Sequence, residues 1–315
     1  MQISPETQLF IREHQTDDVR ALALQARKYP NVDMPTAITQ IAGRQVAAEK
    51  IPSWRDTDDI WYPKHLSLEQ CSSEVTARYK ATLLKGNSLT DLTGGFGIDC
   101  AFLAAKFKSA IYVERQQELC EIAAHNFPIL NLNHINVKNE DGVSYLQAMS
   151  PVDCIFLDPA RRNEHGGKTV AISDCEPDVA ELEELLLNKA GQVMVKLSPM
   201  LDLSLALKEL QHVQKVHIIS ANNECKELLL ILGQASVEEI SIHCVNLPTK
   251  GIQEEQHFVF TREQEQCSEC NYTDTLENYL YEPNASLLKA GAFRSIASAF
   301  PVKKLHPNSH LYTSD

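Results

Sequence analysis

The stretch Leu89-Thr90-Asp91-Leu92-Thr93-Gly94-Gly95-Phe96-Gly97 decides the fold. It predicts a short apolar strand that ends at an acid, then a glycine-rich turn, then an Ala- and Leu-rich helix over 98–107. Glycine permits a positive φ and lets a ligand approach the backbone closely. A strand, a glycine turn and a helix in this order are typical of nucleotide-binding α/β folds.

Strands and helices alternate on both sides of this turn. Two later apolar runs, 216–220 and 228–232, are separated by too few residues for a crossover connection, so we expect them to be antiparallel neighbours. The pattern predicts an α/β fold with a Rossmann-like seven-stranded sheet covered by helices on both faces. The other predicted strands are 89–92, 109–113, 135–137, 153–157 and 192–197, and the predicted helices are 98–107, 117–126, 143–149, 179–188 and 203–212.

The pattern changes at both ends, which predicts three domains. Residues 1–66 are expected to form a helical N-terminal domain, and residues 67–236 the α/β domain. Residues 237–315 are expected to form a small α+β, ferredoxin-like domain. It would contain a hairpin from 240–245 and 257–261, a strand at 279–282, a helix over 285–299 and a strand near Lys303. Since no helix closes the final residues, we expect the chain to be truncated.

The composition is that of a globular protein, with 43% hydrophobic residues in 315. No run approaches 18 apolar residues and the N-terminus lacks a signal-peptide pattern, so neither a membrane span nor secretion is expected. The nine cysteines lie mostly inside apolar runs, which indicates free thiols and a cytoplasmic location. Cys267 and Cys270 are the only close pair and lack a second pair, so no metal site is predicted.

The formal net charge is −13. Proteins that hold long nucleic acids mainly through phosphates are usually basic, so an RNA-binding surface here would have to be local. The basic candidates are Arg161, Arg162 and Lys168, and Lys303 with Lys304. For the lysine pair we favour a role in solubility.

Two acids follow the next strands. Glu114 ends the second strand about 20 residues after the glycine turn, where a carboxylate accepts both ribose hydroxyls of a nucleotide. After the third strand, Asp141 is suited to bind the adenine amino group. Glu140 and a helix-capping role for Asp141 are the alternatives. A G-x-G-x-x-G pattern would place a third glycine at Cys100; its absence argues against a nicotinamide enzyme.

The fourth strand ends in Leu157-Asp158-Pro159-Ala160-Arg161-Arg162. With this loop, the sequence over roughly residues 68–235 resembles class I S-adenosylmethionine (SAM)-dependent methyltransferases. It looks nearest to bacterial methyltransferases with a THUMP-like C-terminal domain, and is more distantly similar to RNA guanine-N2 methyltransferases. The segments that carry this nearer resemblance are 68–74, 158–162 and 223–227.

The resemblance implies SAM as cofactor and S-adenosylhomocysteine (SAH) as product. It implies that Asp91, Thr93, Gly94, Gly95, Phe96, Gly97, Glu114, Asp141 and Asp158 contact the cofactor. In the related amino-methyltransferases an acid and the next carbonyl accept hydrogen bonds from the target N–H groups, which assigns Asp158 and Pro159 to catalysis. This sequence departs from the usual pattern because Ala160 replaces a second proline and Arg161 replaces the aromatic residue that stacks on the base. Arg161 or Arg162 would then stack on a base or hold a phosphate.

The expected function is SAM-dependent methylation of a nitrogen of an RNA base, because THUMP domains bind RNA. The alternatives are a protein or small-molecule methyltransferase, a nicotinamide-dependent oxidoreductase, or a non-catalytic binding module. Methylation of a pyrimidine C5 needs a nucleophilic cysteine. The segment after the fifth strand, 195–200, has none, and Cys225 is interpreted as a buried thiol. The oligomeric state is not predicted.

Overall fold

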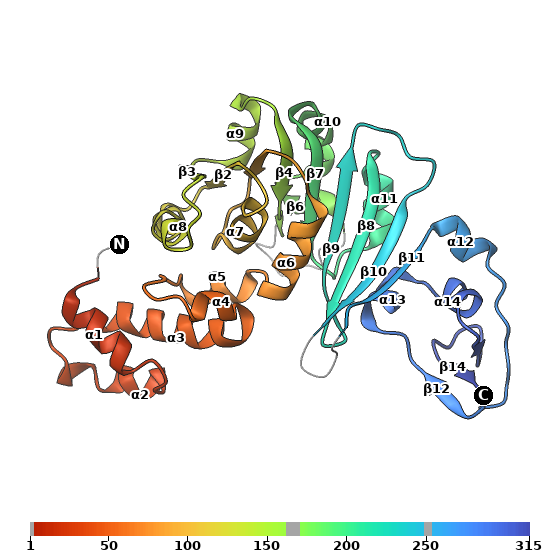
Figure 1. The fold of residues 1–315 in the computed structure, drawn as a ribbon, viewed down its shortest axis with the longest axis horizontal. Coiled ribbons are helices and arrows are strands. Elements are labelled where there is room, and N and C mark those ends of the chain that lie inside the picture. Colours follow the sequence, from red (N-terminus) through yellow and green to blue (C-terminus); the bar gives the residue numbers. More distant parts are fainter. Residues whose placement is uncertain (1–2, 162–170, 249–253) are drawn as a thin grey trace. The chain divides into compact units, whose positions relative to one another are not determined.

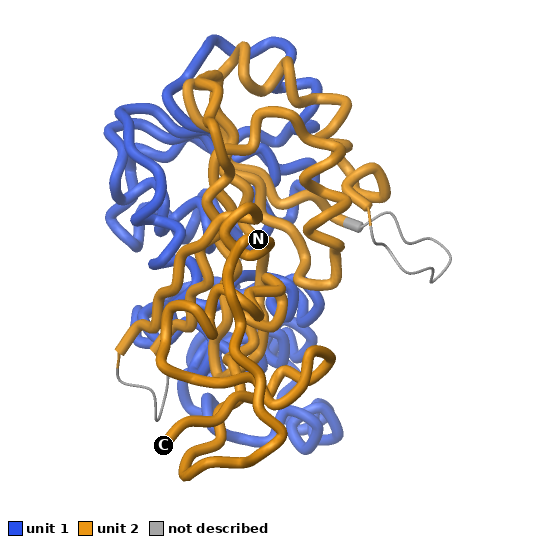
Figure 2. The backbone as a smooth tube through the Cα atoms, turned by 90° about the vertical axis from the view of Figure 1, so that its right-hand side faces the viewer, with its two compact units in different colours: residues 1–155 blue, residues 156–315 orange. Residues whose placement is uncertain are grey.

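The computed structural model describes residues 3–161, 171–248 and 254–315. The chain, drawn as a ribbon in Figure 1, divides into two compact units, Met1–Ile155 and Phe156–Asp315 (Figure 2). The division falls inside strand β4 (Val152–Leu157). The glycine turn therefore belongs to unit 1, and Asp158 belongs to unit 2.

Unit 1 begins with helices that carry side-chain caps. The Ser4 hydroxyl accepts a hydrogen bond from the N–H of Thr7, and the Asp33 carboxylate accepts one from the N–H of Thr36. Such caps satisfy backbone donors that the first helical turn leaves without partners. The helices are α1 (Pro5–Glu13), α2 (Val19–Leu24), η1 (Ala26–Lys28), α3 (Met34–Lys50), α4 (Pro52–Arg55), α5 (His65–Gln70), α6 (Glu74–Leu83), α7 (Ile98–Ala104), α8 (Gln117–Ile129) and α9 (Gly142–Ala148).

Helix α3 joins two hydrophobic cores. Its first half packs with Phe10 and Leu22 in a small core of N-terminal helices. Its second half, with Trp54 and Tyr62, packs into a larger core that includes Phe96 of the glycine turn. Residues on both sides of the predicted boundary at 66 and 67 therefore share one core.

The strands of unit 1 bring their carboxyl ends to one edge. They are β1 (Ser88–Asp91), β2 (Ser109–Glu114), β3 (Ile135–Asn139) and β4, in the order β4-β1-β2-β3. β2 runs parallel to β1 and β3, with Asp91 beside Tyr112 and Glu114 beside Asn139. The acids at these strand ends are thereby gathered at the same edge of the sheet.

Unit 2 contains the remaining elements. Its helices are η2 (Ile172–Asp174), α10 (Val179–Lys189), α11 (Leu203–Glu209), α12 (Arg262–Cys267), α13 (Ala285–Ala290) and α14 (Arg294–Ala299). Its strands are β5 (Ala160–Arg161), β6 (Cys175–Glu176), β7 (Ala190–Leu197), β8 (Val213–Ala221), β9 (Glu224–Gly233), β10 (Ser241–Leu247), β11 (Gln256–Phe260), β12 (Tyr279–Tyr281), β13 (Lys303–Lys304) and β14 (Tyr312–Ser314).

In unit 2 the order is β11-β10-β8-β9-β7, and β9 is antiparallel to both β7 and β8. The predicted antiparallel pair is confirmed, with a tight turn at Asn222 and Asn223, whose φ angles are +53° and +55°. The orders β4-β1-β2-β3 in unit 1 and β8-β9-β7 in unit 2 are those of a methyltransferase sheet, so the predicted fold class is confirmed. The predicted hairpin is confirmed, since β10 pairs antiparallel with β11. It is not separate from the central sheet but continues it, because β10 also pairs in parallel with β8.

A separate three-stranded sheet, in the order β12-β14-β13, closes the C-terminal region, and its pairings are antiparallel. The single helix predicted over 285–299 is wrong: Gly291, with φ of +74°, ends α13, and α14 begins at Arg294. β14 was not anticipated. In the part of the chain that the structure describes, no helix has the length and hydropathy needed to span a bilayer.

Candidate active site

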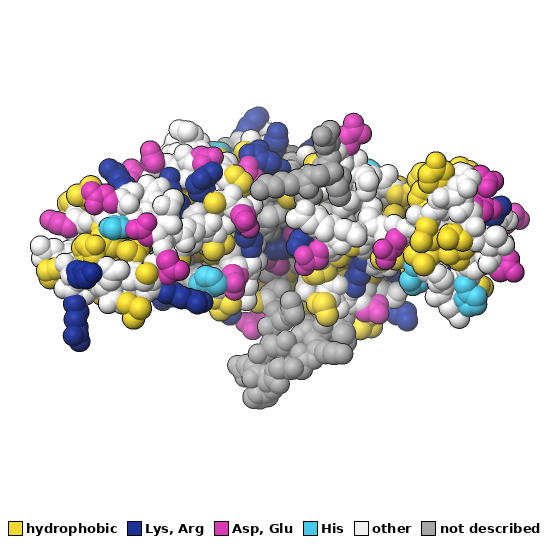
Figure 3. Space-filling view, turned by 90° about the horizontal axis from the view of Figure 1, so that it is seen from below, with side chains coloured by type: hydrophobic (Ala, Val, Ile, Leu, Met, Phe, Trp, Pro, Cys, Tyr) yellow, Lys and Arg dark blue, Asp and Glu magenta, His cyan; other side chains and the backbone are white. Residues whose placement is uncertain are grey.

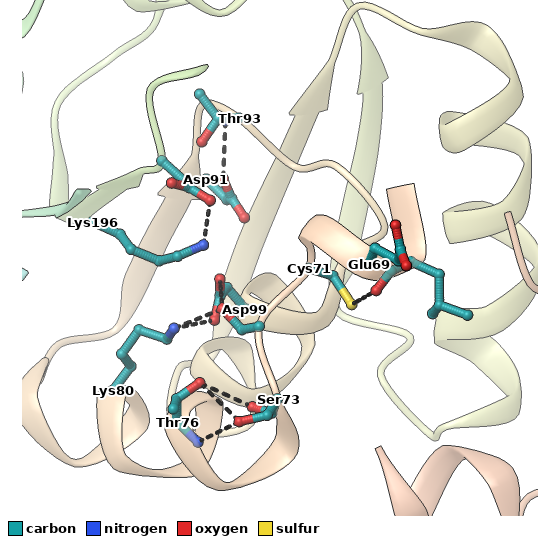
Figure 4. A network of polar contacts seen from close by, with 12 residues as sticks. Glu69, Cys71, Ser73, Thr76, Lys80, Asp91, Thr93, Asp99 and Lys196 are labelled. Carbon is teal, nitrogen blue, oxygen red and sulfur yellow. Dashed lines mark hydrogen bonds and ion pairs between the residues drawn. The ribbon is translucent and has the colours of Figure 1, made fainter. Parts of the chain in front are cut away.

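The glycine turn starts at Asp91, whose side chain is buried. Its Oδ1 accepts a hydrogen bond of 2.9 Å from the N–H of Thr93, so the carboxylate shapes the turn directly after β1 (Figure 4). Gly95 and Gly97 adopt φ angles of +54° and +88°. These left-handed conformations explain why the turn contains glycine rather than a residue with a Cβ.

The glycines differ in what a side chain would meet. A Cβ on Gly94 would lie 2.2 Å from the Tyr112 ring, and a Cβ on Gly97 would lie 3.0 Å from the Phe127 ring. A Cβ on Gly95 would meet only the carbonyl oxygen of Thr93, at 3.8 Å. Two glycines are therefore required by packing behind the turn, and Gly95 presents backbone to open space.

Glu114 holds the turn onto β2. Its Oε2 accepts a hydrogen bond of 2.9 Å from the N–H of Gly95, and its Oε1 accepts one of 2.8 Å from the N–H of Gln116. The Tyr112 hydroxyl donates to the carbonyl oxygen of Gly95 at 2.5 Å. Sequence reasoning missed Tyr112, because this residue lies on the next strand and no local pattern links it to the turn.

The loop after β3 approaches the same turn. A Cβ on Gly142 would lie 2.3 Å from the carbonyl oxygen of Leu92, so this glycine permits close contact between the two loops. Asp141 caps α9, since its Oδ1 accepts hydrogen bonds from the N–H groups of Val143 and Ser144. The capping alternative for Asp141 is thus observed, and its adenine-binding role stays a prediction.

Phe96 has a structural role that differs from that of the glycines in the turn. Its side chain is buried in the larger core, where its ring lies 5.1 Å from that of Trp54 at an angle of 71°. Phe96 therefore anchors the turn from behind, and a ligand over the turn would meet its backbone. The structure also reveals Lys80 and Asp99, which no sequence rule singled out, as an ion pair next to the turn (Figure 4).

In unit 2, Asp158 follows β4 and is ion-paired with Lys196 near the end of β7. The Asp158 side chain is 35% exposed and that of Lys196 is 11% exposed. Pro159 is buried. A carboxylate that is partly accessible and is oriented by a largely buried lysine can accept a hydrogen bond from a bound substrate.

Arg161 lies in β5, where its backbone pairs with Cys175 of β6. The structure does not describe its side chain, and Arg162 and Lys168 lie outside the described residues. The proposed contact of Arg161 with a base or phosphate therefore stays a prediction.

Cys225 does not have the environment of a nucleophile. Burial raises the pKa of its thiol to about 11, which keeps the sulfur protonated at neutral pH. Cys225 is half-buried rather than fully buried as predicted, and its protonated thiol does not support a nucleophilic role. Within residues 3–161, 171–248 and 254–315, no group of three or more His, Cys, Asp and Glu side chains is arranged to hold a metal ion.

These features define a class. The strand orders, the acid-and-glycine turn after β1 and the acid after β2 are those of the class I SAM-dependent methyltransferase fold. In agreement, residues 48–163 match the family described as protein-L-isoaspartate(D-aspartate) O-methyltransferase, and residues 279–315 match a ferredoxin-like domain.

A solved structure of a protein from Porphyromonas gingivalis W83, assigned as a methyltransferase, is 36% identical to this chain. The match covers 98% of this chain and 77% of that chain, with a TM-score of 0.86. The chain belongs to the family of this Porphyromonas methyltransferase.

More distant structures match about half of the chain. An rRNA methylase from Streptococcus thermophilus is 16% identical, with 51% of this chain and 95% of that chain covered and a TM-score of 0.36. SMU.1697c from Streptococcus mutans, solved in complex with SAH, is 15% identical, with 50% and 95% covered and a TM-score of 0.37. At these values neither match bears on the function. A comparison with curated proteins finds no match.

Proposed function

We propose that this methyltransferase uses SAM and transfers its methyl group to a nitrogen of an RNA base. The observation that best supports SAM as the cofactor is the hydrogen bond that Glu114 accepts from the N–H of Gly95. It sets a carboxylate beside open backbone at the end of β2. A carboxylate in that place accepts hydrogen bonds from ribose hydroxyls.

The chemistry of unit 1 fits SAM in two further respects. Gly95 leaves space over the turn that a Cβ would begin to fill. Asp91, Glu114 and Asp141 supply carboxylates at three neighbouring strand ends. When bound, SAM supplies an activated methyl group with its leaving group already in place.

Asp158 supports nitrogen as the methyl acceptor. A carboxylate accepts a hydrogen bond from an amino N–H and stabilises the positive charge that develops on the nitrogen during transfer. Lys196 keeps Asp158 oriented through their ion pair. The carbonyl of Pro159 would accept the second N–H, and the two contacts together would orient the nitrogen lone pair.

RNA as the methyl acceptor is supported by a sequence resemblance. The resemblance of segments 68–74 and 223–227 to THUMP-like methyltransferases supports RNA. The net charge of −13 favours a protein or small-molecule acceptor instead. Basic and acidic side chains are interspersed on the face seen in Figure 3. An RNA substrate would thus need local contacts, for which Arg161 is the first candidate.

The cofactor half is tested by calorimetric titration of SAH into the protein, with NADH as competitor. We expect SAH to bind and NADH not to displace it, and Glu114→Gln to weaken SAH binding by about tenfold or more. Glu118→Gln is the matched control, because Glu118 is exposed and pairs with Lys64 on the surface. Binding of NADH in place of SAH would contradict the proposal.

A further inference from the structure

Beside the glycine turn lies a buried charge that the proposed reaction does not use. Lys80 of α6 has a fully buried side chain, and its Nζ lies 2.9 Å from Oδ1 of Asp99 in the first turn of α7. Nζ also donates a hydrogen bond of 2.7 Å to the hydroxyl of Ser72. The Ser72 hydroxyl in turn donates to Oδ2 of Asp99 at 2.7 Å.

These three residues, the Lys80 network, form a closed ring of contacts. Each carboxylate oxygen of Asp99 faces one of the other two members. Burying a lysine and a carboxylate costs several kcal/mol per ion, and a buried pair is often no more stabilising than apolar side chains of similar volume. Stability alone is therefore a weak reason for a lysine at this position.

The network ties the segment before α6 to the helix that follows the glycine turn. Asp99 follows the glycine turn by two residues, at the start of α7. Ser72 belongs to the segment before α6, whose first turn is capped by the hydroxyl of Ser73 through the N–H of Thr76. Figure 4 shows the Lys80 side chain pointing towards Asp99.

We propose that the Lys80 network is a positioning device for the cofactor site: it fixes residues 71–73 against the first turn of α7 and so sets the width of the space over the glycine turn. The inference rests on the proposed use of SAM. Lys80 itself is a positioning residue, because a fully buried ammonium group cannot reach a ligand. Its loss should weaken binding of SAM and SAH and leave the methyl-transfer step at saturating SAM nearly unchanged.

The test is the double variant Lys80→Met with Asp99→Asn, which removes both charges at nearly constant volume. We expect the melting temperature of the double variant to stay within a few degrees of wild type. Its SAH dissociation constant and its KM for SAM should each rise about tenfold, and its kcat should stay within about twofold of wild type. Ser72→Ala, which removes the bridging hydroxyl and keeps the ion pair, should weaken SAH binding in the same direction and provides the readout if the double variant does not fold.

Arg78→Met is the matched control. Arg78 lies on the same helix and forms an ion pair with Glu74, but its side chain is 60% exposed. It should bind SAH like wild type. Unchanged SAH affinity in the folded double variant, or in Ser72→Ala if the double variant does not fold, would overturn this inference alone. Failure of the wild-type protein to bind SAH would overturn the proposed function and this inference together.

Discussion

Gly94 and Gly95 are adjacent, yet the structure requires glycine at each for a different reason. Gly94 is packed against the Tyr112 ring, and Gly95 has a positive φ and faces open space. The sequence motif predicted that glycines form the turn. It could not separate these roles, because the ring behind Gly94 comes from the next strand and no local pattern announces it.

Alanine substitutions should separate packing from ligand approach. Gly94→Ala forces a Cβ into the Tyr112 ring and should lower the free energy of unfolding by about 1–3 kcal/mol. Gly95→Ala should cost about 1–2 kcal/mol through its left-handed backbone, and the folded variant should lose SAH affinity about tenfold. Urea denaturation and calorimetric titration check both. Equal SAH affinity in Gly95→Ala and wild type would show that no ligand approaches this face.

Asp141 has one observed role and one predicted role, and two variants distinguish them. Asp141→Ser keeps a capping oxygen for α9 and removes the carboxylate, so stability should change by less than about 0.5 kcal/mol while SAH affinity falls. Asp141→Ala should cost about 1 kcal/mol as well. If Asp141→Ser binds SAH as tightly as wild type, capping is its whole role and Glu140 becomes the next candidate.

At the scale of elements, hydrophobic periodicity predicted the strands and helices of the central sheet within a few residues. Hydrophobic periodicity failed where a single residue changes the backbone conformation, and where paired strands are far apart in the sequence. Gly291 splits the predicted C-terminal helix, and β14 is three residues long. β10 looked like part of a separate hairpin because its partner β8 lies more than 20 residues earlier in the chain.

β8, β10 and β11 also carry a ladder of stacked histidines, His217, His243 and His257. Burial, and then the neighbouring histidines, lower the pKa of His217 to about 3; burial and then His257 lower that of His243 to about 4. In the unfolded chain both titrate near the ordinary value of about 6.5. Between about pH 6.5 and pH 4 the unfolded chain therefore binds more protons, and stability should fall as the pH falls.

This dependence is measurable as the free energy of unfolding in urea between pH 7 and pH 4.5. His217→Phe should reduce the slope by up to about 1.4 kcal/mol per pH unit, because it removes one of the two low-pKa groups. A variant slope equal to that of wild type would mean that His217 does not contribute.

At the scale of the whole molecule, the sequence predicted a change from helices to α/β structure but not which residues share a core. The Pro- and Trp-containing stretch 51–64 falls inside the predicted N-terminal domain, residues 1–66. In the structure, Trp54 and Tyr62 from that stretch are buried against Phe96. Tertiary packing of this kind has no local signature, because the contacting residues are more than 30 positions apart.

Trp54 should therefore matter for the cofactor turn as well as for folding. Trp54→Ala removes the support behind Phe96 and should lower the free energy of unfolding by about 3–5 kcal/mol. Trp61→Ala is the control, since Trp61 is only partly buried and stacks on His125. Thermal melts with and without SAH compare them. Equal losses in the two variants would contradict a special role for Trp54.

The most direct test is transfer of labelled methyl from SAM to total RNA and to total protein from cells lacking this gene. Wild-type protein should label RNA. Asp158→Ala should lose the labelling but still bind SAH, and Lys226→Met should retain it because its ion pair with Glu224 is local to the β8–β9 turn. Label in protein or small molecules but not in RNA would contradict the RNA assignment and leave SAM-dependent methyl transfer standing. Absence of label in every fraction, with no SAH binding, would contradict the account as a whole.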